Sequence, residues 1–213
     1  IMINGRKIDL FDYKRVFLIG FGKASAEMAK AMEEIVEFDD SAIISTRKAE
    51  TRRAKIYIGT HPYPSQENID ITEKILEIVK KADKDDLIFC LISGGGSSLL
   101  CKPRVSLEAL IDVTEELMKK GCGIEELNTV RKHLSCVKGG QLAKMSKAKI
   151  ISLIISDIIG NPVEFISSGP TAEDTTTFED ALKILKKYGV KNKEVLEVIK
   201  RGIKGEIDET PKK

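Results

Sequence analysis

Apolar residues along the chain occur in short runs that are separated by charged segments and glycine turns. Six consecutive apolar residues at 87–92 lie between Asp85–Asp86 and a run of three glycines, which is typical of a strand buried on both faces. Comparable runs at 15–19 and 150–155 predict two further buried strands, and shorter runs at 42–45 and 55–60 predict two more. No apolar run approaches the roughly 18 residues of a membrane-spanning helix, so no membrane span is predicted.

The segments between these runs carry apolar residues at helical spacing. Helices are predicted from residue 24 onward, at about 66–82, from Ser106 to Gly121, and at about 177–188 and 192–202. Strands that alternate with helices predict a three-layer αβα fold with a mainly parallel, Rossmann-like sheet. Ligands bind such sheets at the carboxyl ends of the strands, so we expect a cleft where the strands ending at Ile19, Thr60, Ile92 and Ile155 finish.

Length and composition narrow the class of protein. The 213 residues suit one large α/β domain over 1–204, followed at 205–213 by a polar segment that reads as the start of a linker. A net charge of +2 and the lack of a long basic block argue against nucleic-acid binding. Four cysteines without a Cys-x-x-Cys pair, and only two histidines, argue against structural zinc and predict a reducing, cytoplasmic setting.

The first candidate binding element is the glycine loop that follows the strand at 87–92. It consists of Ser93, Gly94, Gly95, Gly96, Ser97 and Ser98. Three glycines expose backbone amides with no Cβ to keep a ligand away, and a helix start would add its dipole. A phosphate or carboxylate site is therefore favoured over the alternative, a plain tight turn.

A second glycine turn, Gly20-Phe-Gly22, follows the strand at 15–19 and leads into a helix. It resembles a dinucleotide-binding fingerprint, but Ser25 replaces the third glycine. Thr46 and Arg47 stand where that fingerprint needs an acidic residue after the next strand. Lys23 is the more informative residue, because a lysine in the first helical turn can direct its ammonium at a phosphate. A solvated surface lysine is the alternative.

Three further positions carry candidate chemistry. The segment at 131–140 places Lys132, Lys138, Gly139 and Gly140 in one basic stretch, which is either a second anion-contacting element or a solvated face. Asp157 follows the strand at 150–155, where it could hold Mg²⁺ or simply cap a turn. His61 lies at the end of the strand at 55–60, and a structural role for it is as well supported as a functional one.

Six motifs occur in order over residues 15 to about 188. They are 20–24 (Gly-Phe-Gly-Lys-Ala), 60–64 (Thr-His-Pro-Tyr-Pro), 93–98 (Ser-Gly-Gly-Gly-Ser-Ser), 131–140 (Arg-Lys-His-Leu-Ser-Cys-Val-Lys-Gly-Gly), 156–160 (Ser-Asp-Ile-Ile-Gly) and 168–171 (Ser-Gly-Pro-Thr). As a set they resemble the glycerate 2-kinase family of the MOFRL type. The resemblance implies ATP-dependent phosphorylation of D-glycerate to 2-phosphoglycerate with Mg²⁺. It also implies that Lys23 is catalytic and that the glycine loop lies in the active-site cleft, and it leaves a homodimer open.

The chain departs from the family pattern in two ways. The family continues beyond a linker, here starting near Glu209, into a C-terminal domain that is expected to contribute catalytic residues, including an arginine. The resemblance therefore implies a part of a longer protein, whose activity on its own is in question. The family also often has an acid where this chain has Asn161, which leaves Asp157 as the better metal ligand.

Two alternatives from other functional classes stay open. An NAD-dependent hydroxypyruvate reductase is favoured by Gly20 and Gly22, and disfavoured by Ser25 and by the missing acidic residue. A non-catalytic sugar-phosphate-binding module would need only the glycine loop. Neither a Walker P-loop nor the protein-kinase motifs occur in the sequence, so any nucleotide must be held by a different cradle.

Overall fold

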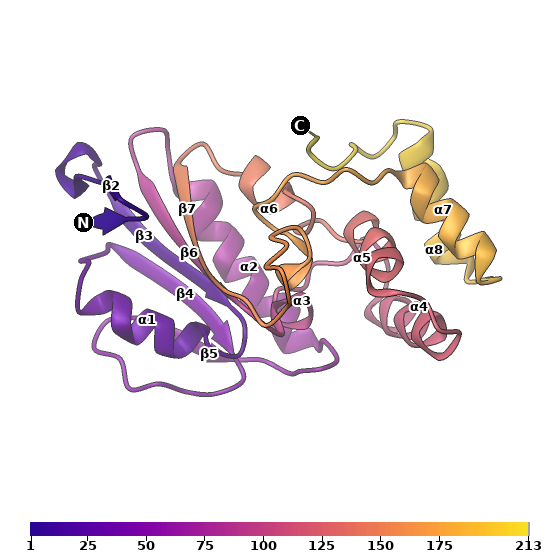
Figure 1. Cartoon of the computed structure of the whole chain (residues 1–213), viewed down its shortest axis with the longest axis horizontal. Coiled ribbons are helices and arrows are strands. Elements are labelled where there is room, and N and C mark those ends of the chain that lie inside the picture. Colours follow the sequence, from indigo (N-terminus) through magenta and orange to yellow (C-terminus); the bar gives the residue numbers. More distant parts are fainter. Residues whose placement is uncertain (213) are drawn as a thin grey trace.

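The fold is organised around a sheet of five parallel strands. In the computed structural model, which describes residues 1–212, the strand order is β5-β4-β3-β6-β7 (Figure 1). Every neighbouring pair is parallel. The strands are β3 (Val16–Phe21), β4 (Asp40–Ser45), β5 (Ile56–Ile58), β6 (Leu87–Ser93) and β7 (Lys149–Ile155). All five lie where the apolar runs predicted strands, and the predicted three-layer α/β fold is confirmed.

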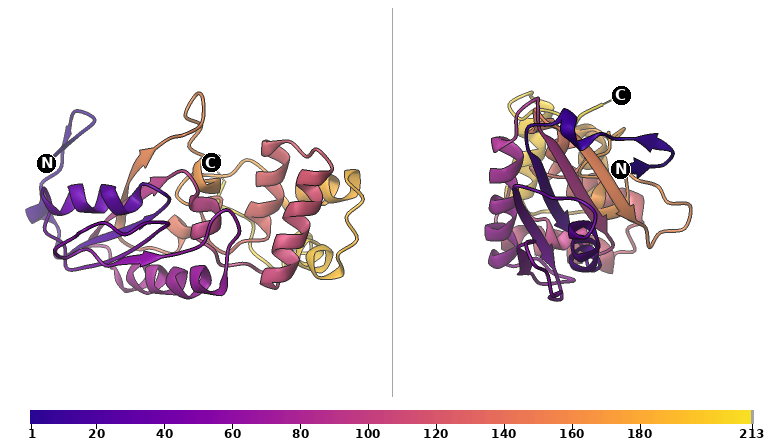
Figure 2. Two further views of the ribbon diagram at one scale, coloured as in Figure 1. Left: turned by 90° about the horizontal axis from the view of Figure 1, so that it is seen from below. Right: turned by 90° about the vertical axis from the view of Figure 1, so that its left-hand side faces the viewer.

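Two apolar cores cover the two faces of the sheet. Phe17, Ile19 and Phe21 of β3 pack into the core beneath α2 (Gln66–Lys81). The alternate residues Val16 and Leu18 pack into the core beneath α1 (Ser25–Glu33). Figure 2 shows α1 and α2 on opposite sides of the strands. The period of two along β3 is thus satisfied on both faces, which explains why the strand reads as a continuous apolar run.

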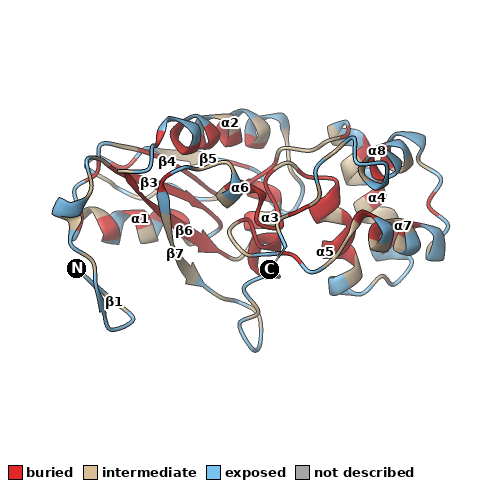
Figure 3. Ribbon diagram, turned by 90° about the horizontal axis from the view of Figure 1, so that it is seen from above, coloured by how far each residue is buried: buried red, intermediate tan, exposed pale blue. Residues whose placement is uncertain are grey.

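β7 differs from the buried strand that its sequence predicts. All seven residues of β6 are buried, whereas the interior of β7 is only partly buried and Ile155 is 52% exposed. Figure 3 shows this contrast as red central strands beside a largely tan β7. The reason is topological, because β7 is an edge strand that pairs with β6 alone.

Four longer helices form a separate unit, here called the helical subdomain. They are α4 (Leu107–Lys119), α5 (Ile124–His133), α7 (Phe178–Lys187) and α8 (Lys193–Ile203). Val113, Leu117, Leu185 and Ile199 are among the residues of its own apolar core. In Figure 1 the subdomain lies at the right, beyond the end of the sheet at which the strand arrows point.

The sequence predicted three of these four helices. Ser106 caps α4 as expected, with its hydroxyl accepting a hydrogen bond from the amide of Ala109. Thr177 and Asp180 form a reciprocal capping box at the start of α7. The helix that escaped prediction is α5, because its polar residues mask the apolar face that Leu127 and Val130 present to the subdomain core.

Short elements complete the chain. β1 (Met2–Ile3) and β2 (Arg6–Lys7) form an antiparallel hairpin, followed by the 3₁₀ turn η1 (Leu10–Asp12). The helices α3 (Gly96–Leu99) and α6 (Gln141–Lys144) and the 3₁₀ turn η2 (Ile166–Ser168) lie between the sheet and the helical subdomain (Figure 1). Among residues 1–212, none of the helices combines the length and apolar composition that a bilayer crossing requires.

The start of a linker was predicted over 205–213, of which residue 213 lies outside the described residues. In the structure, residues 206–212 fold back onto the protein. Glu209 accepts hydrogen bonds from Nε2 of His133 at 2.9 Å and from the amide of Phe178 at 3.0 Å. Thr210 is buried and donates to Asp174, whose amide donates to the carbonyl of Pro211. This segment therefore ties α5 to the start of α7. That it leads to a second domain stays a prediction.

Replacing Glu209 by Gln should lower the free energy of unfolding at pH 7 by about 1–2 kcal/mol, since charged hydrogen bonds contribute more than neutral ones. Burial raises the pKa of Glu209, but the hydrogen bonds from His133, Phe178 and Thr210 outweigh it and hold that pKa at about 2. The carboxylate therefore stabilises the fold fully above its ordinary pKa of 4.5, and this stabilisation is lost as the pH falls towards 2.

Urea unfolding of the wild type and of Glu209→Gln between pH 7 and pH 3 measures this difference. The free energies of unfolding of the two proteins should approach each other as the pH falls. Glu206→Gln is the matched control, because Glu206 is exposed and its one ion pair within residues 1–212 is the surface pair with Arg201. Equal stability of wild type and Glu209→Gln at pH 7 would contradict the role assigned to Glu209.

Candidate active site

The strand order places a crevice at the carboxyl ends of β3 and β6. In chain order the five sheet strands are arranged 3-2-1-4-5, so the connections leave the adjacent strands β3 and β6 towards opposite faces. Such a switch point is where doubly wound sheets bind ligands. The turn at Gly22–Lys23 follows β3 and the glycine loop follows β6. The two candidate elements that the sequence singled out therefore meet at one place.

The two turns touch through their backbones. The amide of Lys23 donates to the carbonyl of Gly94 at 2.9 Å, and the amide of Ala24 donates to Oγ of Ser93 at 3.0 Å. Gly22 has a φ of +129°, and a Cβ at this position would lie 2.2 Å from Oγ of Ser93. Only glycine permits this approach, which fixes Lys23 beside the glycine loop.

The glycine loop presents free amide groups. Gly95 adopts a left-handed conformation, with φ of +83°, and α3 starts directly after it. Considering residues 1–212, the amides of Gly94, Gly95, Gly96 and Ser97 donate no hydrogen bond to another protein group. Neighbouring unpaired amides of this kind form a concave donor surface that suits an anion.

Three ionisable side chains from different elements surround this loop. A Cβ built on Gly95 would lie 3.0 Å from Cδ2 of His61 and 3.1 Å from Cγ of Lys23. One built on Gly94 would clash with the carboxylate of Asp157. Burial and then the nearby Lys23 ammonium lower the pKa of His61, with Asp157 opposing them. His61 is therefore largely neutral at pH 7, when its imidazole can accept a proton.

The other predicted contacts are committed to internal partners. Lys132 is buried and pairs with Asp174 at 3.2 Å, and the buried Nζ of Lys138 donates to the carbonyl of Leu100 at 2.7 Å. The amides of Gly139 and Gly140 donate to the carbonyls of Ser168 and Gly169. The structure thus brings together Lys23, the glycine loop and Asp157. Lys132, Lys138, Gly139 and Gly140 instead make hydrogen bonds and ion pairs within the protein. Their ligand contacts stay a prediction.

Two serines that the sequence analysis left out of the site lie against the loop. Ser168 donates its hydroxyl proton to Oδ1 of Asn128 and accepts a hydrogen bond from the hydroxyl of Ser97 at 2.9 Å. Ser167 donates to the carbonyl of Ser93. Ser167 and Ser168 have φ values of +53° and +62°, which are uncommon for residues other than glycine. The available signal was the turn-rich motif at 168–171, which does not reveal which loop it packs against.

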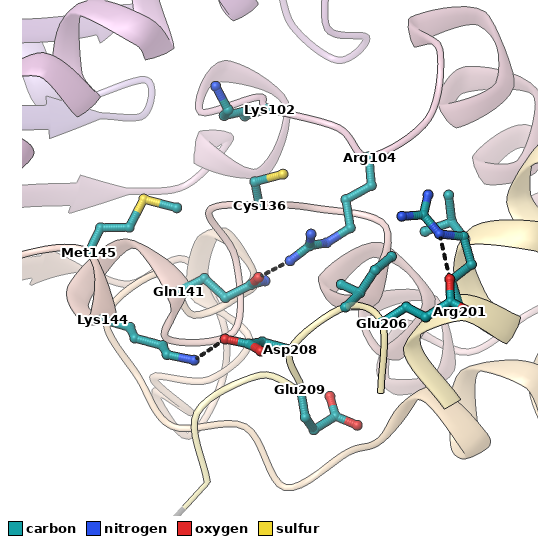
Figure 4. A pocket seen from close by; sticks show the side chains of 12 residues that line it. Lys102, Arg104, Cys136, Gln141, Lys144, Met145, Arg201, Glu206, Asp208 and Glu209 are labelled. Carbon is teal, nitrogen blue, oxygen red and sulfur yellow. Dashed lines mark hydrogen bonds and ion pairs between the residues drawn. The ribbon is translucent and has the colours of Figure 1, made fainter. Parts of the chain in front are cut away.

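A groove of about 790 Å³ lies elsewhere, between α6, α8 and the C-terminal segment (Figure 4). Its cations are paired within the protein: Lys144 with Asp208, and Arg201 with Glu206. Arg104 donates to Oε1 of Gln141 at 2.6 Å. None of the sequence-predicted site residues lines this groove.

Comparison with known proteins identifies the family of this chain. A family model described as "Domain of unknown function (DUF4147)" matches residues 2–201. The chain belongs to this family. Named relatives include a "Glycerate 2-kinase" of Pyrococcus horikoshii, 43% identical over 219 aligned positions that cover 100% of this chain and 49% of the relative. The predicted resemblance to glycerate 2-kinases is thereby confirmed.

Two further similarities bear on function. A crystal structure titled as a glycerate kinase from Thermotoga maritima superposes with a TM-score of 0.86 at 39% identity, covering 95% of this chain and 50% of that one. A relative from Agrobacterium vitis carries the provisional name hydroxypyruvate reductase, at 43% identity over 83% of this chain and 42% of its own length. The chain spans about half the length of these relatives of the DUF4147 family.

The residues around the loop suit a nucleotide-borne Mg²⁺ better than an all-protein metal site. Among residues 1–212 no cluster of three or more His, Cys, Asp or Glu side chains could hold a metal ion. Mg²⁺ is commonly bound through one or two carboxylates while substrate phosphates and water supply the other ligands. The exposed carboxylate of Asp157 beside free amides fits that arrangement.

Gly96→Ala should destabilise the protein by about 2–4 kcal/mol and disturb the loop, because the new methyl group has no space. Its Cβ would lie 2.1 Å from Oγ of Ser167 and 2.9 Å from Cδ2 of Phe21. Gly123→Ala is the matched control, since a Cβ there meets nothing within 4 Å. That control should cost less than about 1 kcal/mol. Thermal unfolding of both variants measures the difference in their stability. Equal melting temperatures for Gly96→Ala and Gly123→Ala would contradict the prediction.

Lys138 should make stability depend on pH in the alkaline range. Burial, reinforced by the nearby charge of Arg131, lowers the pKa of Lys138 from 10.5 to about 7. Between these values the unfolded chain holds the proton and the folded one does not, so the free energy of unfolding rises with pH. Lys138→Met should flatten that rise in urea unfolding between pH 7 and pH 10. The exposed Lys144→Met should leave it unchanged, and parallel curves for wild type and Lys138→Met would contradict the assignment.

Proposed function

We propose that this chain is the N-terminal part of a glycerate 2-kinase, which transfers the γ-phosphoryl group of ATP to the 2-hydroxyl of D-glycerate and forms 2-phosphoglycerate. The observation that carries the proposal is the meeting of Lys23, Asp157 and the free amides of the glycine loop at the switch point of the sheet. The names of the glycerate kinases among its relatives support the substrate.

The site suits phosphoryl transfer because that reaction needs positioned positive charge more than covalent chemistry. Lys23 is exposed, and within residues 1–212 its ammonium forms no ion pair, so its charge is free to meet a phosphate. The amides of the glycine loop supply further donors without moving. Asp157 is the residue that would hold Mg²⁺, which neutralises charge on the nucleotide phosphates when bound.

His61 completes the set with proton chemistry. The substrate hydroxyl must lose a proton when it is phosphorylated, and a neutral imidazole at this place can receive it. The Lys23 ammonium beside it favours the neutral form of the ring before reaction. The sequence left the role of His61 undecided, and its position next to Lys23 and Gly95 supports the functional one.

The proposed activity belongs to a longer protein. Since the chain spans about half of its relatives, we propose that a C-terminal MOFRL domain supplies further catalytic residues, including an arginine, and that this chain alone is inactive. The four free cysteines, two of them buried, fit the reducing cytoplasm. A homodimer is the assembly compatible with the family resemblance.

The reductase alternative has one observation in its favour, the name of the Agrobacterium vitis relative. The local structure fits it less well. The Ser25 hydroxyl donates to the carbonyls of Gly22 and Ile44, so it fills the place of the third glycine. After β4 the chain continues with Thr46 and Arg47, and an acidic residue for a ribose is missing there. A melting-temperature increase with NADH and none with ATP would favour the reductase.

Lys23→Ala in the full-length protein should reduce turnover of D-glycerate and ATP by about 10²–10³-fold, because a charge aimed at the transferring phosphate is lost. A coupled assay for ADP and 2-phosphoglycerate measures the rate. Lys30→Ala is the matched control and should keep full activity, because Lys30 is an exposed lysine on α1, the helix that begins two residues after Lys23. Unchanged turnover in Lys23→Ala would remove this lysine from the mechanism, and binding without any ATP consumption by the wild type would favour the non-catalytic module.

A further inference from the structure

A second hollow, here called the Arg131 pocket, opens beside the glycine loop. Its volume is about 270 Å³, and it lies between the turn at 61–64, the loop residues Gly95, Ser97 and Ser98, and the helices α4 and α5. Most of its walls are apolar. Leu110, Ile111 and Met118 come from α4, and Leu127 comes from α5. A pocket of this composition with one charged group is suited to a small ligand oriented by that group.

The charged group is Arg131, which has no acidic partner. Its only hydrogen bond within residues 1–212 runs from Nη2 to the carbonyl of Ser97 at 3.2 Å. No buried side-chain nitrogen or oxygen of the described chain lacks a hydrogen-bond partner, so the remaining guanidinium nitrogens are accessible in the pocket that Arg131 lines. The nearby Lys138 does not neutralise it, because the two positive charges repel each other.

Among the other partly buried arginines of the described chain, Arg15 forms an ion pair with Asp86 at 2.6 Å. Within the same residues Arg104 also has no acidic partner, but it donates to the carbonyl of Ser135 and to Oε1 of Gln141, whereas Arg131 donates to one carbonyl only. An uncompensated guanidinium in an apolar setting is costly, and burial lowers the pKa of Arg131 accordingly. At Arg131 this cost arises next to the loop of free amides, where an incoming anion would remove it.

The shape of the donor favours a carboxylate. The planar fork of a guanidinium matches two carboxylate oxygens, and the apolar walls leave few further donors for the several oxygens of a polyphosphate. His61 lines the same pocket and also lies beside Gly95 and Lys23. A short hydroxy acid held by its carboxylate at Arg131 would therefore reach towards His61 with its hydroxyl group.

We propose that Arg131 binds the carboxylate of the hydroxy-acid substrate, and that the Arg131 pocket is the acceptor site. This inference rests on the proposed kinase function and adds to it the group that recognises the acid. It assigns Lys23 and the free amides of the glycine loop to the phosphoryl donor, and the hollow lined by His61 and Arg131 to the acceptor.

Titration of D-glycerate into the 213-residue chain, by calorimetry and by thermal shift, tests the assignment directly. Arg131→Gln should weaken D-glycerate binding by about 100-fold, since one partner of a desolvated charge pair is removed. Arg131→Lys should recover only part of it, because the fork is lost. Without ligand, Arg131→Gln should be as stable as the wild type or more so. A purely structural arginine would instead lower the melting temperature of the ligand-free protein. The exposed Arg52→Gln, which loses only a surface pair with Glu34, is the control.

Kinetics on the full-length protein separates this inference from the proposed function. Arg131→Gln should raise the KM for D-glycerate by about 100-fold and leave the KM for ATP within about twofold. A raised KM for ATP with an unchanged KM for D-glycerate would overturn the inference while the kinase function stands. A wild type that binds D-glycerate through Arg131 but never phosphorylates it would refute the kinase function and keep the carboxylate site. Binding of D-glycerate that is equal in wild type and Arg131→Gln would refute the site.

Discussion

The site depends on one close approach, that of the turn after β3 to the turn after β6. At Gly22 and Gly94 there is no space for a side chain, because a Cβ would run into Ser93 or Asp157. Backbone hydrogen bonds between the two turns then set the position of Lys23 against the loop. Ordering a glycine costs more conformational entropy than ordering other residues. The fully buried strands β3 and β6 offset this cost, because they fix the start of both turns.

The sheet and the helical subdomain have separate apolar cores, and polar contacts join them around the site. Two serines of η2 make such contacts: Ser167 donates a hydrogen bond to the carbonyl of Ser93, and Ser168 donates one to Asn128 of α5. Both serines adopt backbone conformations that are unfavourable for serine. The buried pair of Lys132 and Asp174 and the docked segment at 206–212 hold the next layer. The helices thus position the walls of the pocket, while the sheet positions Lys23 and the glycine loop.

The sequence revealed the parts of this protein that follow from local patterns. Apolar runs located the strands, and the glycines located the crevice, because both properties belong to neighbouring residues. Pairing between distant residues could not be read in this way. The sequence predicted Lys132 as a ligand contact but could not reveal its pair with Asp174, 42 residues away. Arg131 belongs to the same basic stretch, for which an anion-contacting element and a solvated face both stayed open, and the sequence could not show that it lines a pocket. The edge position of β7 is likewise a property of strand order, and apolar composition alone made it look buried.

The edge position of β7 affects how the protein associates with other molecules. β7 reads Lys-Ile-Ile-Ser-Leu-Ile-Ile and has one charged residue, and its outer side has no neighbouring strand within residues 1–212. Native proteins usually protect exposed edge strands with several charges, a proline or a β-bulge. Here Ile155 and, beyond it, Ile159 stand open to water. At high concentration the outer row of amides and carbonyls can template the addition of a strand from another molecule, so self-association is the characteristic hazard of this chain.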